Sequence, residues 1–296
     1  MQAHAGEDSR TSVAMSPSGR FVASVSTAEE NWKLWDAASG AERMAGPRHD
    51  GTGTCLCRVA GSVRISLDEG CPVVAHTAGL RALAFSPCGQ RLASGGKDGT
   101  VILWDAQSGR AEQSIQAVSE NWVVTCVSFS ADGALVASGS SDGLIHVWDA
   151  TTRALLRTIP HANNENGVRD VQFSPTTSRM VATASWCGIT LFDVDSGEAV
   201  EMLRGCNFAA FAPDGRTIAT KSFDRDGGVW LVDVELGAIR LRLTSHVQGV
   251  SAAAFSDDDR SKLVTVGHDS ACKVWGTSTC KVWDQGRLKL PGKTKM

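Results

Sequence analysis

The stretch LASGGKDGTVILWDAQSG, residues 92–109, decides the fold of this chain. Its first half is a strand-like apolar run that stops at Asp98-Gly99, and its second half is another apolar run that ends at Trp104-Asp105. Two such runs on either side of an Asp-Gly pair predict a β-hairpin with a two-residue turn, because glycine readily adopts left-handed backbone angles. A large tryptophan at the end of a strand indicates a packing role.

The hairpin pattern returns along the chain. Residues 84–109 and 128–153 align without a gap, and 11 of the 26 positions are identical. Looser copies occupy residues 14–40, 172–197, 210–237 and 254–280. The tryptophan position recurs at steps of 44, 44, 40 and 43 residues, through Trp104, Trp148, Phe192, Val232 and Trp275. A period of this length indicates a repeat protein built from one supersecondary unit.

These repeats resemble those of the WD-repeat (WD40-type) β-propellers, which run to about 40–45 residues with four strands per blade. The residues that carry the resemblance are His76, the FSPCG turn at 85–89, Ser94, Asp98-Gly99 and Trp104-Asp105. The resemblance covers nearly the whole chain. It implies an all-β propeller of four-stranded antiparallel blades, with residues 1–290 as a single domain and 291–296 as a basic tail.

The number of blades depends on residues 41–75. From Trp35 to Trp104 the step is 69 residues, which is too long for one repeat. Residues 52–60 read as a first strand, and 61–76 read as a third strand, a turn and a fourth strand. We therefore expect seven blades with a shortened second blade, and the alternative is six blades plus an insertion.

Closure of the ring has two explanations. Many members of the family complete the last blade with an N-terminal strand, but only three residues precede His4, which lies near the start of the first repeat. The last repeat carries its own outer strand at 280–290. Either packing between blades alone closes the ring, or the chain is a piece of a longer protein.

The resemblance implies a side-chain hydrogen-bond network inside each blade. The physical reason is general, because a half-buried carboxylate and a buried indole N–H both need partners. The network residues are His76, Ser94, Asp98 and Trp104, then Ser138, Asp142 and Trp148, and finally His246, Thr265, Asp269 and Trp275. Glu120 stands where the repeat of Trp148 would carry its histidine, and Cys187 stands where another repeat would carry its aspartate, so we expect those blades to be looser.

Composition limits the classes of function. The 296 residues are 42% apolar and 21% charged, which favours a folded core over disorder. A net charge of −3 gives no overall basic footprint for nucleic acid, and no apolar run is long enough to cross a membrane. The nine cysteines are scattered, and free thiols in the cytoplasm or the nucleus explain them most simply.

No motif for chemistry is present. The sequence has no GxxxxGK[ST] phosphate loop, no HExxH and no GxSxG turn. Cys55 and Cys57 form an isolated CxC, which is too close and too unsupported for a zinc site. We therefore expect no catalytic residues, no cofactor and no metal.

Recognition is expected on the narrower face of the propeller, since loops on a rigid scaffold carry function. The resemblance places there the residues before each turn aspartate and those that start the first strand of a blade. They are Arg81, Lys97, Trp122, Thr125, Arg169, Trp186, Arg225, Ser251 and His268. Tryptophan and cationic side chains around one opening suit an acidic or phosphorylated peptide with an apolar anchor.

The main hypothesis is a non-catalytic interaction scaffold that binds a protein or peptide, as a monomeric propeller within a larger complex. The alternative is a regulatory or sensor module of a larger multidomain protein with a nucleotide-binding or kinase domain. An enzyme is a third and weaker hypothesis. The fold by itself does not decide among them.

Overall fold

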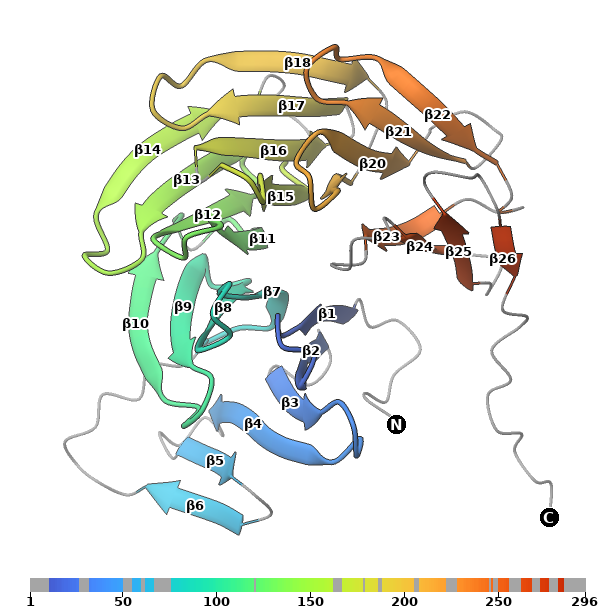
Figure 1. Cartoon of the computed structure of the whole chain (residues 1–296). Helices are drawn as coiled ribbons and strands as arrows, with labels where there is room; N and C mark the ends of the chain where they lie inside the picture. The colour runs from blue at the N-terminus through green and yellow to red at the C-terminus, as the bar shows by residue number, and fades with distance from the viewer. Residues whose placement is uncertain are drawn as a thin grey trace.

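The computed structural model describes residues 11–26, 32–49, 55–59, 62–66, 76–119, 121–161, 167–177, 179–185, 188–204, 208–221, 228–244, 246, 250–255, 262–267, 272–276 and 282–284. These residues form strands β1 to β26 in six antiparallel sheets, which we name A to F in chain order (Figure 1). None of the described residues lies in a helix that could cross a membrane. The predicted all-β propeller is confirmed.

Sheet A contains six strands that pair in chain order. They are β1 (Thr11–Met15), β2 (Phe21–Ser26), β3 (Trp32–Asp36), β4 (Glu42–His49), β5 (Cys55–Val59) and β6 (Ser62–Ser66).

Sheets B, C and D each contain four strands, which also pair in chain order. Sheet B is β7 (Leu80–Phe85), β8 (Arg91–Gly96), β9 (Thr100–Asp105) and β10 (Ala111–Gln116). Sheet C is β11 (Val124–Phe129), β12 (Leu135–Ser140), β13 (Leu144–Asp149) and β14 (Leu155–Pro160). Sheet D is β15 (Asp170–Phe173), β16 (Met180–Ser185), β17 (Gly188–Asp193) and β18 (Ala199–Arg204).

Sheets E and F repeat the same four-stranded plan. Sheet E is β19 (Ala210–Phe211), β20 (Thr217–Lys221), β21 (Val229–Asp233) and β22 (Ile239–Leu243). Sheet F is β23 (Val250–Phe255), β24 (Lys262–Gly267), β25 (Cys272–Gly276) and β26 (Val282–Asp284).

The hairpin predicted at 92–109 is confirmed as β8 and β9, which pair with Leu92 opposite Trp104. Its turn differs from the prediction. The strands are joined by the three residues 97–99, and the N–H of Gly99 donates to the carbonyl of Gly96 at 3.3 Å. Gly99 has a φ of +74°, and a Cβ there would lie 2.7 Å from the carbonyl oxygen of Val118. Glycine therefore supplies the left-handed third residue of the loop instead of the second residue of a two-residue turn.

The middle strands of sheets B to E are apolar on both faces because a neighbouring sheet lies against each face. Residues 101–104 of β9 are all buried. Five apolar clusters join successive sheets among the described residues: A with B, B with C, C with D, D with E, and E with F. The aromatic residue near the end of the third strand faces the preceding sheet, as Trp104 does toward sheet A and Trp148 toward sheet B.

The prediction of seven blades is not supported, whereas the alternative of six blades is. Strand β5 forms within the predicted 52–60 strand, but it pairs with β4, with His49 opposite Cys55. The hairpin β5–β6 therefore extends the outer edge of sheet A, and the described part of residues 41–75 forms no separate sheet. The reason is the register of β4, which is eight residues long and leaves an edge that β5 completes.

The close packing of neighbouring sheets provides the first prediction. A Cβ at Gly139 of β12 would lie 2.5 Å from Cγ1 of Val168, ahead of sheet D, and 2.6 Å from Sγ of Cys126. Gly139→Ala is expected to lower the free energy of unfolding by about 1–3 kcal/mol through overpacking, as measured by urea denaturation. The double variant Gly139→Ala/Val168→Ala should lose less stability than the sum of the two single changes. Strict additivity would show that the two positions do not compete for space.

Candidate functional site

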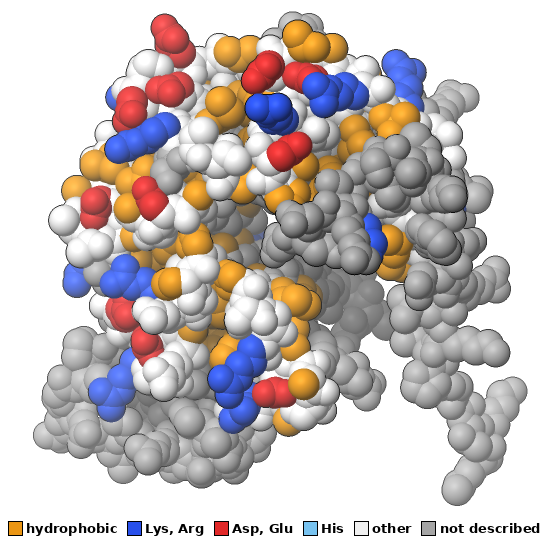
Figure 2. Space-filling view, viewed as in Figure 1, with side chains coloured by type: hydrophobic (Ala, Val, Ile, Leu, Met, Phe, Trp, Pro, Cys, Tyr) orange, Lys and Arg blue, Asp and Glu red, His pale blue; other side chains and the backbone are white. Residues whose placement is uncertain are grey.

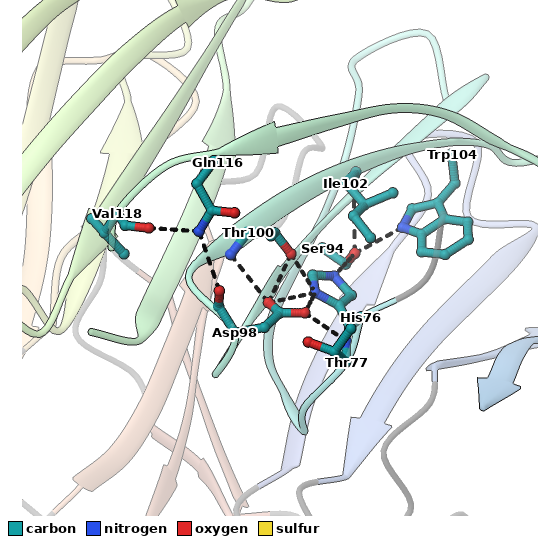
Figure 3. Close-up of polar contacts among 9 residues, drawn as sticks. All are labelled: His76, Thr77, Ser94, Asp98, Thr100, Ile102, Trp104, Gln116 and Val118. Carbon is teal, nitrogen blue, oxygen red and sulfur yellow. Dashed lines mark hydrogen bonds and ion pairs between the residues drawn. The ribbon is translucent and has the colours of Figure 1, made fainter. Parts of the chain in front are cut away.

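A buried polar network connects the strands of sheet B (Figure 3). His76 lies between Asp98 and Ser94, with Nδ1 3.0 Å from Oδ1 of Asp98 and Nε2 2.7 Å from Oγ of Ser94. The indole N–H of Trp104 donates to the same Ser94 oxygen at 2.7 Å. Because a carboxylate only accepts, Nδ1 of His76 carries a hydrogen and donates it to Asp98. One chain of hydrogen bonds thus runs from the turn to the strand-end tryptophan.

Asp98 has further donors besides His76. The hydroxyl of Thr100 donates to its Oδ1 at 2.7 Å, and the backbone N–H of Thr77 donates to its Oδ2 at 2.7 Å. Burial is the largest single influence and opposes ionisation, but the hydrogen bond and charge of His76 and the bonds from Thr100 outweigh it and lower the pKa of Asp98. Gly96 makes room for this pair, since a Cβ there would lie 2.3 Å from Nδ1 of His76. The cluster is a structural connection between two turns.

The same connection is partly present in other sheets. Trp275 donates its indole N–H to Oγ1 of Thr265 at 2.9 Å, and Nε2 of His246 lies 2.8 Å from that oxygen. Trp35 donates to Ser24 at 2.8 Å. Asp269 lies outside the described residues, as do Glu120 and Cys187.

Sheet C keeps a looser version of the network. The indole N–H of Trp148 lies 3.3 Å from Oγ of Ser138. Asp142 accepts from the N–H of Leu144 at 2.9 Å and from Ser140, and so it caps its own turn. His146 stacks on Trp148 with ring centroids 5.8 Å apart. Burial lowers the pKa of this histidine, against a smaller opposite effect of Asp142.

Three of the predicted face residues share one backbone feature. Each of them occupies the extra position of a β-bulge at the start of the first, innermost strand of its sheet. The three residues are Arg81 in β7, Thr125 in β11 and Ser251 in β23. A bulge reorients the side chain of its extra residue. Arg81 is half-buried, and Thr125 is half-buried with its hydroxyl donating to the carbonyls of Gly139 and Val168. Thr125 therefore ties sheet C to the segment that leads into sheet D.

Lys97, Trp122 and Arg169 lie at the same end of their sheets as these bulges. The N–H of Lys97 donates to the carbonyl of Gly79, just before β7, and the N–H of Arg169 donates to Ala184 near the end of β16. Trp122 precedes β11 and is 45% exposed, whereas every other tryptophan with a described side chain is buried. Lys97 and Arg169 are half-buried.

The remaining predicted face residues cannot be added to this group. Trp186, Arg225 and His268 lie outside the described residues, as does the side chain of Ser251. Acidic and basic side chains are interspersed on the face of the molecule shown in Figure 2. No group of three metal-ligating side chains occurs in the described part of the chain.

The sequence analysis missed a set of bonds between neighbouring innermost strands. The N–H of Ala209 donates to Oδ2 of Asp170 at 3.1 Å, and the N–H of Phe211 donates to Oε1 of Gln172 at 3.3 Å. Between sheets C and D, the N–H of Phe173 donates to Oγ of Ser128 at 3.2 Å. The repeat alignment could have pointed to these bonds, because it sets the polar residues Asp170 and Gln172 at positions that are alanine in sheet B.

The surroundings of Asp170 set its charge. Desolvation by the atoms around the carboxyl raises its pKa to about 6, although the N–H groups of Ala209 and Val171 act in the opposite direction. Ionisation of Asp170 therefore lowers the stability of the folded state.

The network of sheet B provides a second prediction. Ser94→Ala removes the acceptor of Trp104 and the partner of His76, and it should lower the free energy of unfolding by about 1–3 kcal/mol in urea denaturation. Ser138→Ala is the matched control, because Ser138 has only the longer bond from Trp148, and it should cost less. Equal losses in the two variants would contradict the idea that the histidine makes the network of sheet B stronger.

A third prediction concerns pH. The pKa of Asp170 is raised from 3.8 to about 6 in the fold, so the folded state binds the proton more tightly than the unfolded chain. The contribution of this group to stability is therefore greatest below its unfolded pKa, and it is lost as the pH rises to about 6. Asp170→Asn should gain stability relative to the unmodified chain between pH 4 and 6 and keep that gain at pH 8, as measured by urea denaturation. A difference that does not change with pH would contradict the assignment.

Comparisons with known proteins agree with this architecture. Residues 70–105, 113–149 and 237–276 match the family model described as WD domain, G-beta repeat. The periodic tryptophan protein 2 homolog of Dictyostelium discoideum is 26% identical over 213 residues, which cover 68% of this chain and 17% of that protein. The Denticleless protein homolog B of Xenopus laevis is 23% identical over 131 residues, which cover 40% of this chain and 18% of that protein.

A LEC14B homolog of Prunus armeniaca is 29% identical over 65 residues, or 22% of this chain and 13% of that protein. The aligned segments thus span less than a fifth of the length of each of these relatives. The resemblance predicted from the sequence is confirmed: the chain carries WD40 repeats, and its six sheets form a β-propeller of the WD-repeat type.

Proposed function

We propose that this chain is a non-catalytic interaction scaffold that binds a protein or peptide with acidic or phosphorylated side chains. The binding face is the end of the sheets that carries the β8–β9 turn and the bulges that start the innermost strands. The similarity to WD-repeat proteins supports a protein-binding role. The fold alone would not assign it, so the argument depends on the side chains of that end.

The observation that carries the proposal is the exposure of Trp122. A tryptophan that leaves 45% of its surface in water, in a chain that buries its other described tryptophans, is an anchor without a partner in the isolated propeller. Tryptophan and arginine dominate the energetics of protein interfaces, because their large surfaces become desolvated on binding. Lys97, Arg81 and Arg169 lie at the same end of neighbouring sheets and supply positive charge for carboxylates or phosphates.

Two observations support a rigid face. The backbone bond from Lys97 to Gly79 ties the β8–β9 turn to the start of β7. The N–H of Val123 donates to Oγ of Ser141 at 2.9 Å, while the N–H of Ser141 donates to the carbonyl of Val123 at 2.9 Å, which fixes the segment after Trp122. A side chain on an ordered support loses less entropy on binding than one on a free loop.

A second candidate is a regulatory or sensor module that works within a larger multidomain protein. Its support is the length of the relatives, since the aligned segments span less than a fifth of each of them. The two proposals are compatible, because a module of this kind would still bind partners through its exposed face.

The fourth prediction tests the face directly. Arg81→Glu/Trp122→Ala/Arg169→Glu should lose specific partners in an affinity capture read by mass spectrometry, together with binding of an acidic phosphopeptide mixture. The matched control is Arg110→Glu/Arg153→Glu/Leu236→Ala, whose changes lie in turns at the opposite end of the sheets and should leave binding intact. Both variants are first shown to melt like the unmodified chain. Persistence of the same partners in the first variant, or their loss in the control, would place binding elsewhere.

A further inference from the structure

A short segment joins sheet B to sheet C and carries the exposed tryptophan of the proposed binding face. It comprises residues 117–123, between β10 and β11, and Trp122 lies near its end. Ala117 and Val118 are buried, whereas Trp122 is 45% exposed. The segment is therefore packed at its beginning and presents an aromatic side chain to water near its end. The contacts that hold the segment decide where that side chain lies.

The turn of sheet B holds the beginning of the segment through backbone bonds. The N–H groups of Ala117 and Val118 both donate to the carbonyl of Gly99, at 3.0 and 3.1 Å. A Cβ at Gly99 would lie 2.7 Å from the carbonyl oxygen of Val118 and 3.1 Å from that of Ser119. The β8–β9 turn and the segment are thus in direct backbone contact, which the absence of a side chain at Gly99 permits.

Gln116 adds a side-chain bond to each partner in this contact (Figure 3). Its Nε2 lies 3.3 Å from the carbonyl oxygen of Asp98 and 2.6 Å from that of Val118. Because a carbonyl oxygen only accepts, the atom between the two must be the amide nitrogen, and its two hydrogens serve both oxygens at once. One amide therefore links the turn that contains Lys97 to the segment that contains Trp122.

This amide is a feature of sheet B and not of every repeat. Pro160 holds the position of Gln116 in sheet C, and the side chain of proline has no hydrogen to donate. The corresponding contact in sheet C is the N–H of His161, which donates to the carbonyl of Gly143 at 2.9 Å. The additional bonds thus occur in the sheet that directly precedes Trp122.

The far end of the segment is fixed by the turn of sheet C. The N–H of Trp122 donates to the carbonyl of Ser119 at 2.9 Å. Val123 and Ser141 exchange two bonds of 2.9 Å, from the N–H of Val123 to the serine Oγ and from the N–H of Ser141 to the carbonyl of Val123. Trp122 therefore lies between one attachment to sheet B and one attachment to sheet C.

We propose that Gln116 is a positioning residue that keeps Lys97 and Trp122 at one fixed separation. The face then selects ligands in which an acidic or phosphorylated residue and an apolar residue are a set number of residues apart. The ligand class rests on the proposed function, whereas the positioning is a property of the free protein. Two fixed contact points favour one spacing, because a matching ligand binds without first having to order the protein. A loosely held Trp122 would accept several spacings, each at lower affinity.

The first experiment follows hydrogen exchange of the free protein by mass spectrometry, in peptides that cover residues 117–123. Gln116→Met keeps an unbranched side chain but removes both donors. Because Gln116 is exposed and water competes for its partners, exchange should become faster on the order of fivefold. Gln116→Lys supplies donors again and should bring the rate back towards that of the unmodified chain.

A matched control separates hydrogen bonding from a general effect of the substitution. Gln90→Met makes the same change at an exposed position in the turn between β7 and β8, at the opposite end of sheet B, and should leave the exchange of residues 117–123 unchanged. A glutamine that only filled space would be replaced well by methionine and poorly by lysine. Unchanged exchange in Gln116→Met would overturn the proposal, and so would equal acceleration in Gln116→Lys.

The second experiment measures ligand selection by fluorescence anisotropy. The probes are labelled peptides that carry one phosphoserine and one leucine, separated by a spacer that is lengthened one residue at a time. The unmodified chain should bind one spacing about fivefold more tightly than its neighbours, and Gln116→Met, which leaves the charge of the face unchanged, should lose most of that preference.

The two experiments distinguish this inference from the proposed function. Binding with the same spacing preference in Gln116→Met would overturn the inference and leave the proposed function in place. If no peptide binds the unmodified chain, the proposed function and the ligand class fail together. The exchange rates then decide the positioning role of Gln116 by themselves.

Discussion

The structure depends on one packing constraint: each sheet has two apolar faces, and each face requires a neighbour. The middle strands are buried on both sides, so a single sheet of this sequence could not keep its side chains out of water. Burial of apolar surface is the main favourable contribution to folding, and here it is gained between sheets. The five clusters that join sheets A to F are therefore the core of the protein, divided into layers. The sequence repeats with a period of 40–44 residues because each repeat supplies one sheet that packs against its neighbours.

The polar networks have a secondary role within that arrangement. In sheet B, His76, Asp98, Ser94 and Trp104 connect a turn to the far end of a strand through hydrogen bonds of 2.7–3.0 Å. Each bond adds little net stability, but an unpaired member would be costly in so buried a place. Sheets A, C and F keep parts of the same network, and all six sheets take part in the apolar layers. Apolar packing therefore carries the fold, and the polar networks make particular turns more rigid.

Much of the fold could be predicted from the sequence, because the repeat pattern specifies strands and their order. The hairpin at 92–109 formed as expected, although its turn holds three residues. The seventh blade was wrong for a physical reason. The strand signals in 52–60 and at the start of 61–76 correspond to β5 and β6. A strand signal does not say which edge the strand will join, and β5 pairs with the free edge of β4.

The candidate site was less accessible to sequence reasoning. The repeat alignment set Arg81, Thr125 and Ser251 at equivalent positions of their repeats, but it gave no indication of the bulges at those positions. Asp170 was missed because it belongs to no known sequence motif, although the aligned position in sheet B is alanine. Its role depends on Ala209, which is 39 residues away in the chain.

The bonds from Asp170 and Gln172 have a consequence for how the protein assembles. Strand β19 holds only two residues, and two of the N–H groups at the innermost edge of sheet E donate to side chains of sheet D. The inner edge of sheet E and the polar side chains of sheet D are therefore completed by each other. Contacts of this kind between nearest neighbours make the propeller comparable to a one-dimensional array, in which folding can begin at any unit and spread to the units beside it.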